Sequence, residues 1–160
     1  MGPFSHPSSD DRASIHIDAP PDVVYALVTD VARMGRFSPE CTGGRWLDGA
    51  TGPAVGARFK GTNRRGVARW STTNEVVEAE TDRAFAFETK QSGMRWRYDL
   101  EPDGEGTLLT ESREAWRSQP LVAKIFTAVV LGGTKSHDDE LREGMTATLE
   151  KIKRTAEEGA

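Results

Sequence analysis

The sequence is poor in cysteine and in long apolar runs, and its 25 acidic residues outnumber its 21 Lys and Arg residues. Cys41 is its single cysteine, so no internal disulfide framework can form, and a reduced cytoplasmic setting is expected. No stretch approaches the roughly 20 consecutive apolar residues of a membrane-spanning helix. We therefore predict no integral membrane insertion. A formal net charge of −4 also argues against a nucleic-acid-binding surface, which is usually basic.

Motifs for covalent, metal or cofactor chemistry are missing as well. The His, Cys and carboxylate residues show no metal-ligand spacing. There is no Gly-x-Ser-x-Gly elbow, no phosphate loop and no dinucleotide fingerprint. The sequence thus predicts no metal site and no cofactor, and it leaves the catalytic residues unknown. Because no spacing suggests a partner that would lower the pKa of the Cys41 thiol, we expect a structural thiol.

The length of 160 residues fits one domain. Residues 1–11 are rich in Gly, Pro, Ser and Asp and have no features of a signal peptide, so they predict a flexible N-terminal tail. Residues 12–157 are expected to form a single domain, which is large enough to bury a core without disulfides.

Strand-like blocks fill most of this domain. Alternation of apolar and polar residues predicts a first strand at 12–19. Pro20-Pro21-Asp22 then opens a short helix, and Asp30 starts a second short helix that Gly35 is expected to end. Short links between the later strands predict antiparallel pairing. The six further strands are expected at 44–48, 56–63, 67–80, 84–90, 94–101 and 107–115.

The last element is an amphipathic stretch from about residue 121 to residue 156. Apolar residues recur along it at helical spacing and predict one long C-terminal helix. Gly132-Gly133 interrupts the stripe, and two interior glycines cost a helix roughly 2 kcal/mol relative to alanine. The pair either kinks or breaks the helix, or lets the sheet approach it closely.

This order of elements resembles the helix-grip fold of the START/Bet v 1-like (SRPBCC) superfamily, and above all its bacterial polyketide cyclase/dehydrase and lipid-transport branch. The resemblance implies an α+β fold, in which a seven-stranded curved antiparallel sheet wraps around the long C-terminal helix and two short helices follow the first strand. It covers 12–157 and is specific for fold rather than function. The residues that carry it are 15–25, 30–37, 96–102, Gly106-Thr107 and 145–152.

The resemblance also implies a cavity between the concave face of the sheet and the long helix. Strand alternation and the apolar stripe of the helix predict which side chains line this cavity. The same side chains would also suit a solid core, so an open cavity and a filled one both remain possible. The predicted ligand-binding residues are Phe59, Asn63, Trp70, Phe85, Phe87, Trp96, Tyr98, Glu111, Arg113, His137, Leu141 and Met145.

The facing of strand 107–115 decides which polar groups lie inside. If Leu109 points inward, so do Glu111 and Arg113, whereas a one-residue slip reverses all three. Facing inward, Glu111 and Arg113 would form a structural ion pair or would bind the polar end of a ligand. His137 lies on the helix stripe, as a residue at the cavity mouth or as a general acid or base.

Three functions fit these features, and binding is favoured over catalysis. The first is binding or transport of a small hydrophobic or amphipathic ligand. The second is a cofactor-independent polyketide cyclase or aromatase, with Tyr98, Glu111, Arg113 and His137 as acid–base candidates. The third is a regulatory or stress-related protein with a filled core, acting through a protein partner that the sequence does not identify.

Overall fold

The computed structural model describes residues 12–37, 41–116 and 134–159, and within 134–142 it describes the backbone alone. The predicted tail and Gly132-Gly133 lie outside the described residues. The elements are β1 (Arg12–Ile17), α1 (Pro21–Val28), the 3-10 helix η2 (Val31–Arg36), β2 (Cys41–Trp46), β3 (Arg58–Arg65), β4 (Ala68–Glu80), β5 (Ala84–Thr89), β6 (Met94–Asp103), β7 (Gly106–Ala115) and α3 (Thr134–Glu158).

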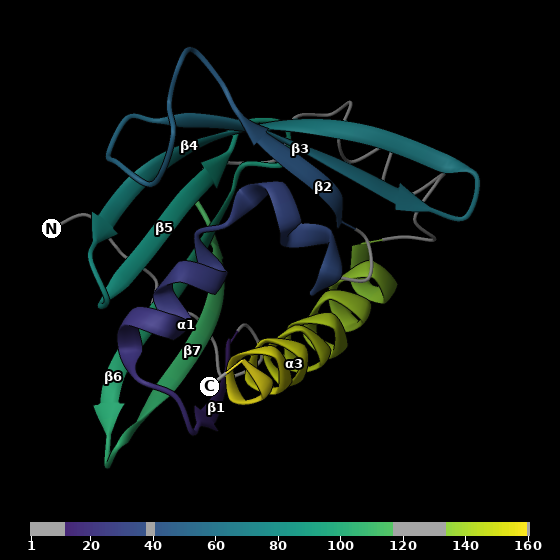
Figure 1. The fold of residues 1–160 in the computed structure, drawn as a ribbon. Helices are drawn as coiled ribbons and strands as arrows, with labels where there is room; N and C mark the ends of the chain where they lie inside the picture. Colours follow the sequence, from purple (N-terminus) through teal and green to yellow (C-terminus); the bar gives the residue numbers. More distant parts are fainter. Residues whose placement is uncertain (1–11, 38–40, 117–133, 160) are drawn as a thin grey trace, which may run out of the picture.

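One antiparallel sheet forms the body of the molecule. Its seven strands lie in the order β1-β7-β6-β5-β4-β3-β2, and every neighbouring pair is antiparallel. The sheet curves around α1, η2 and α3, which lie on its concave side (Figure 1). The predicted helix-grip fold is therefore confirmed.

The two short helices differ in how well the sequence predicted them. Helix α1 has Pro21 in its first turn with Asp22 beside it, as expected. The second is a 3-10 helix that contains Gly35, so the prediction that Gly35 ends it is wrong. A Cβ on Gly35 would lie 2.6 Å from the Thr42 carbonyl carbon. Glycine is required there because η2 packs directly against the backbone of β2.

The hydrophobic core lies between the concave face and the helices. Val24 of α1 and Ile152 of α3 meet residues of the sheet such as Phe85, and all three are almost fully buried. Phe59 and Phe87 pack edge to face with ring centroids 4.9 Å apart, the geometry that aromatic quadrupoles favour.

A polar cluster joins β1, the β6–β7 turn and the end of α3. His16 Nδ1 lies 2.7 Å from Asp103 Oδ2, and His16 Nε2 lies 2.8 Å from Asp18 Oδ1. Lys153 Nζ donates to the His16 carbonyl at 2.9 Å and contacts Glu157 Oε2 at 2.6 Å. The hydrogen bonds to Asp18 and Asp103 raise the pKa of His16, because they favour the protonated imidazole.

This cluster predicts a pH-dependent stability. The pKa of His16 in the folded protein lies above its unfolded value of 6.5. The stabilisation that His16 adds to the folded state is therefore fully present below pH 6.5 and is lost as pH rises through the folded pKa. Urea denaturation of wild type and H16Q from about pH 5.5 to about pH 9 measures the difference. Wild type is expected to be the more stable at the acidic end, and the gap is expected to shrink toward the alkaline end. A gap that is constant with pH would contradict the role of protonation.

Candidate functional site

The structure resolves the facing of β7. Leu109 is fully buried and pairs with Ile15 on one side and Leu100 on the other. Side chains alternate along a strand, so Glu111 and Arg113 share the concave face with Leu109. Both are buried, at 4% and 5% exposure. Of the two alternatives left open by the sequence, the inward one is therefore the one observed.

Register then places the predicted aromatic residues beside these two polar groups. Glu111 stands opposite Tyr98, and Tyr98 stands opposite Phe85. One step along, Arg113 stands opposite Trp96, and Trp96 opposite Phe87. Two cross-strand rows thus run over β7, β6 and β5, each with one polar group at its β7 end.

Glu111 is incompletely hydrogen-bonded on this face. The Tyr98 hydroxyl donates a hydrogen bond to its carboxyl group, while Oε2 is buried and has no hydrogen-bond partner among the described residues. Burial raises the pKa of Glu111 to about 8, against the opposing effect of the Tyr98 hydrogen bond. Burial, together with Glu111, also raises the pKa of Tyr98. Near neutral pH this pair is therefore a carboxylic acid and a phenol, both uncharged.

The sequence left two roles open for Glu111 and Arg113, a structural ion pair and binding of the polar end of a ligand. The described side chains show no salt bridge between these two residues, and Glu111 is bonded to Tyr98 instead.

Asn74 is a second buried polar residue, and unlike Glu111 it has hydrogen-bond partners for both of its amide atoms. Asn74 accepts a hydrogen bond from Thr89 Oγ1 at 2.7 Å and donates to Thr72 Oγ1 at 3.1 Å and to the Phe59 carbonyl at 3.4 Å. Its amide oxygen and nitrogen are both used within the sheet. We therefore assign Asn74 to the structure of the sheet rather than to a ligand.

Cys41 reaches the same interior from the other edge of the sheet. β2 and β6 are separated by three strands in the sheet order. Burial raises the pKa of Cys41. The group is thus a neutral thiol, which is a poor nucleophile.

The remaining predicted residues divide between the sheet and α3. Asn63 and Trp70 stand opposite each other on β3 and β4 and are half-buried. Met145 is buried on α3. His137 and Leu141 lie in the first half of α3, where side chains are outside the described residues.

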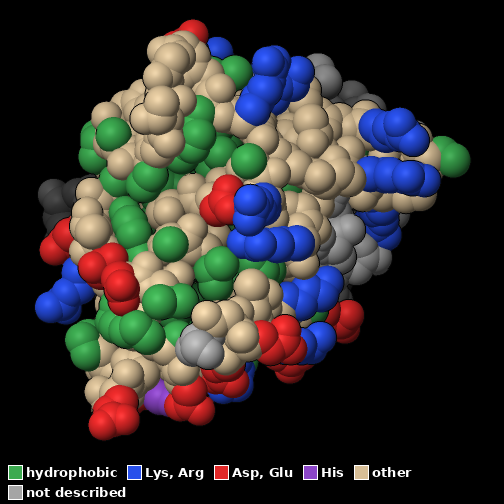
Figure 2. Space-filling model, in the orientation of Figure 1, with side chains coloured by type: hydrophobic (Ala, Val, Ile, Leu, Met, Phe, Trp, Pro, Cys, Tyr) green, Lys and Arg blue, Asp and Glu red, His purple; other side chains and the backbone are tan. Residues whose placement is uncertain are grey.

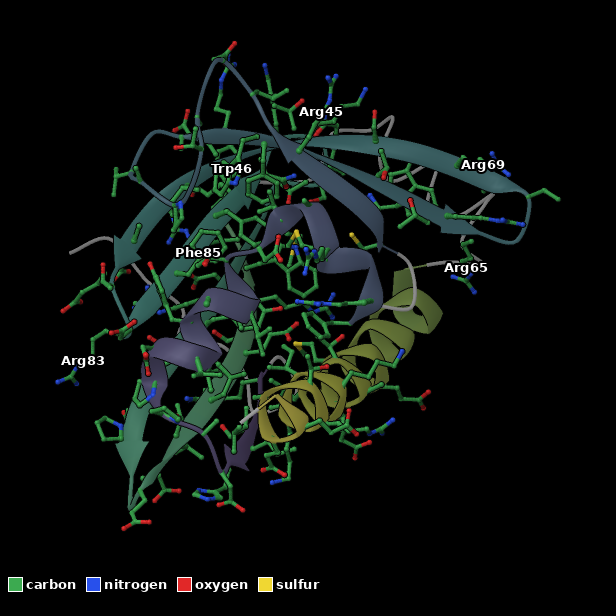
Figure 3. All side chains as sticks on the ribbon, viewed as in Figure 1. Arg45, Trp46, Arg65, Arg69, Arg83 and Phe85 are labelled. Atoms are coloured by element: carbon green, nitrogen blue, oxygen red, sulfur yellow. The ribbon has the colours of Figure 1, made fainter. Side chains whose placement is uncertain are left out.

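Trp46 is an interior aromatic that sequence analysis left unassigned. It pairs with Phe59 and packs against its ring edge to face, with centroids 5.5 Å apart. In Figure 3 its side chain points to the concave side, opposite to Arg45. The predicted strand 44–48 is short, and its alternation does not fix the facing of Trp46. A bulge between Cys41 and Gly43 shifts the register of β2, which no sequence signal marked.

The described residues contain no group of three or more His, Cys, Asp and Glu side chains that could hold a metal ion. No helix within them is both long enough and apolar enough to cross a membrane.

Comparison with known proteins then identifies the family. The family model described as polyketide cyclase / dehydrase and lipid transport matches residues 12–157. A polyketide-cyclase-like protein of Corynebacterium glutamicum, solved in solution, is 36% identical over 95% of this chain and 94% of its own, with a TM-score of 0.63. The chain belongs to the polyketide cyclase/dehydrase and lipid transport family, within the SRPBCC superfamily. The comparison with curated proteins finds no significant match.

Two more distant structures share the fold. The di-domain aromatase/cyclase StfQ of the steffimycin biosynthetic pathway is 15% identical, and the match covers 94% of this chain and 52% of StfQ with a TM-score of 0.69. Ara h 8.0201 is 9% identical over 92% of this chain and 96% of its own, with a TM-score of 0.66. At these identities the likeness concerns the fold alone.

The raised pKa of Glu111 predicts that E111Q stabilises the protein at neutral pH. Unfolding lets the carboxyl ionise at its ordinary pKa of 4.5, so a folded pKa near 8 makes wild type lose stability as pH rises between these values. Urea denaturation at about pH 7 should show E111Q more stable by a few kcal/mol, and the difference should vanish below about pH 4.5.

Glu114 provides the matched control, because it lies on the outer face of the same strand and bonds Arg95 at 3.0 Å. E114Q should be neutral or slightly destabilising at about pH 7. Equal stabilisation by E111Q and E114Q would show that the effect does not come from burial of Glu111.

Proposed function

We propose that the protein binds a small hydrophobic or amphipathic molecule between the concave face of the sheet and α3, and that Glu111 holds its polar end. One observation carries this proposal: a buried carboxyl group, set among aromatic side chains, has one oxygen with no hydrogen-bond partner in the part of the chain that the structure describes. A buried polar atom without a partner costs free energy. A ligand that supplies the missing partner would recover it.

The burial pattern of the concave face supports access for such a molecule. Phe85 and Leu100 are essentially inaccessible, whereas Trp96 and Tyr98, which share their face, are only half-buried. Trp96 and Tyr98 thus keep surface that a bound molecule could cover. Ligand sites are mostly apolar with a few placed polar groups, and these two side chains beside Glu111 have this composition.

The protonation state of Glu111 limits the polar group that it can hold. A protonated carboxyl group offers an O–H donor, and the Tyr98 hydroxyl already donates to the same group. The fitting partner is an acceptor oxygen, such as that of a hydroxyl, carbonyl or carboxyl group. The description of the family, which includes lipid transport, agrees with an apolar molecule that carries such an oxygen.

Ligand binding can be tested by native mass spectrometry of protein purified from its own host, before and after extraction with denaturing solvent. A reproducible extra mass that extraction releases is expected. E111L should weaken binding of the recovered molecule roughly tenfold, because one hydrogen bond is lost, while E111Q, which keeps a donor, should weaken it less. An analogue of the ligand without its polar oxygen should bind wild type and E111L equally. A bare protein mass, with no melting-temperature shift from fatty acids, sterols or aromatic polyketides, would contradict the proposal.

A cofactor-independent cyclase is the second candidate, and the Glu111–Tyr98 pair favours it specifically. A general acid works best when its pKa is near the operating pH, and the pKa of Glu111 is about 8. An enol carbon of the chain would attack a ketone carbon, and Glu111 would donate its proton to the ketone oxygen as the carbon–carbon bond forms. The enol becomes a ketone and gives up its O–H proton, which the Glu111 carboxylate beside Tyr98 takes up, so the acid is regenerated. The fold of StfQ, an aromatase/cyclase, makes this chemistry worth testing.

Turnover of a linear poly-β-ketone analogue, followed by liquid chromatography and mass spectrometry, tests this second function. If the protein is a cyclase, the rate should fall above about pH 8 as Glu111 ionises, and E111Q should slow it by about 10²-fold or more. E114Q should leave the rate unchanged. Release of the ketone chain unaltered by wild type would leave binding as the function.

A further inference from the structure

The outer face of the sheet divides into two halves of different charge. On the β5–β7 half, Arg95 bonds Glu88 at 2.7 Å and Glu114 at 3.0 Å. Arg97 likewise pairs with Glu78 and Asp99. These cations are thus neutralised by acids on the same or neighbouring strands, as cross-strand pairing favours.

On the half formed by β2, β3 and the start of β4, Arg58 pairs with Asp48, but like charges face each other farther along these strands. Arg45 stands directly opposite Lys60, and Arg64 stands directly opposite Arg69. None of these four side chains forms an ion pair within the described residues. Like charges placed opposite each other across two strands destabilise a sheet. Two such pairs on one face are therefore a cost to the fold, which an anionic partner would relieve.

We call these four residues, Arg45, Lys60, Arg64 and Arg69, the basic face. Figure 2 shows Lys and Arg side chains gathered at the top and right of the molecule, over β2, β3 and β4, while most acidic side chains lie below. In Figure 3, Arg45 and Arg69 point away from the concave interior. A hollow opens at the first pair, lined by Gly44, Arg45, Lys60 and Thr62.

An apolar side chain stands at the end of the basic face. Gly66 and Val67 form the turn between β3 and β4, and Gly66 adopts a positive φ of 60° that suits a tight hairpin. Val67 is fully exposed, at 102%. The hairpin extends beyond the rest of the sheet (Figure 1), so its tip is the first part of this face that a flat surface would meet.

We propose that the basic face and the β3–β4 hairpin dock the protein on a membrane that contains anionic lipids. The four cations bind lipid phosphates and Val67 enters the apolar boundary of the bilayer. Positive charge alone would also suit an acidic protein as the partner. The exposed apolar side chain of Val67, at a projecting tip with Arg64 and Arg69 on the two strands beside it, favours a membrane instead. This docking is independent of the ligand proposed above, because it involves the outer face of the sheet and not the interior.

The test is sedimentation of the protein with phosphatidylglycerol vesicles and with phosphatidylcholine vesicles. Binding is expected to the anionic vesicles alone and is expected to be lost at about 0.5 M salt. K60E/R69E should lower the partition coefficient at least tenfold, because each basic residue near such a surface contributes roughly fivefold. V67W should raise it, because tryptophan partitions into the membrane interface.

The variants are chosen so that loss of binding cannot come from unfolding. K60E and R69E each turn a like-charged pair into an opposite-charged pair, so urea denaturation should show the fold unchanged or more stable. K151E/R154E on α3 is the matched control: it changes the net charge equally at two exposed residues outside the basic face, and it should leave vesicle binding intact.

Three results would overturn the proposal. One is no binding of wild type to phosphatidylglycerol vesicles at low salt. Another is equal loss of binding in K151E/R154E and K60E/R69E, which would make net charge the cause. The third is binding of soluble polyglutamate as tightly as vesicles with no effect of V67W, which would assign the basic face to an acidic polypeptide. Empty vesicles are used without added ligand, so each result is separate from the outcome of the ligand-binding test.

Discussion

The register of β7 is the constraint on which the interior of this protein depends. The strand pairs with both β1 and β6, and Leu109 fills the core between Ile15 and Leu100. Because side chains alternate, the burial of Leu109 forces Glu111 and Arg113 to the same side. A slip of one residue would free the carboxyl group but would expel Leu109 from the core. The requirement to bury apolar surface thus places an acid in the interior, where burial keeps it protonated near neutral pH.

The same sheet treats two buried polar residues in different ways, and the difference indicates their roles. Asn74 is enclosed by Thr72, Thr89 and the Phe59 carbonyl, which use both its amide oxygen and its amide nitrogen. Glu111 is bonded to Tyr98, and its other oxygen has no partner within 12–37, 41–116 and 143–159. The sheet therefore can supply hydrogen-bond partners to a buried side chain, as it does for Asn74. Where a buried polar atom such as Glu111 Oε2 lacks such a partner at a cost in stability, a bound molecule is expected to supply it.

Much of this architecture could be predicted from the sequence, because alternation, turn residues and helical spacing are local signals. These signals predicted seven strands, the proline start of α1 and the grouping of Phe85, Phe87, Trp96 and Tyr98 on one face. They did not predict that Gly35 lies inside a 3-10 helix. Glycine is needed at this position because of a close approach to Thr42, which belongs to another element and gives no local signal. They also could not link Glu111 to Tyr98. That pairing depends on the register between β6 and β7, which is a property of two strands rather than one.

The outer face shows why net charge is a poor guide to what a surface can bind. The chain has a net charge of −4, yet some of its acids are held in pairs with Arg95 and Arg97. Acids used in this way neutralise the cations beside them and leave distant cations uncompensated. Salt limits electrostatic effects to about 10 Å at 0.1 M, so an approaching surface responds to the nearest charges rather than to the total. The like-charged pair Arg64–Arg69 therefore dominates the local potential at the tip of the β3–β4 hairpin, and the pair Arg45–Lys60 dominates it farther along the same face, although the chain as a whole is negative.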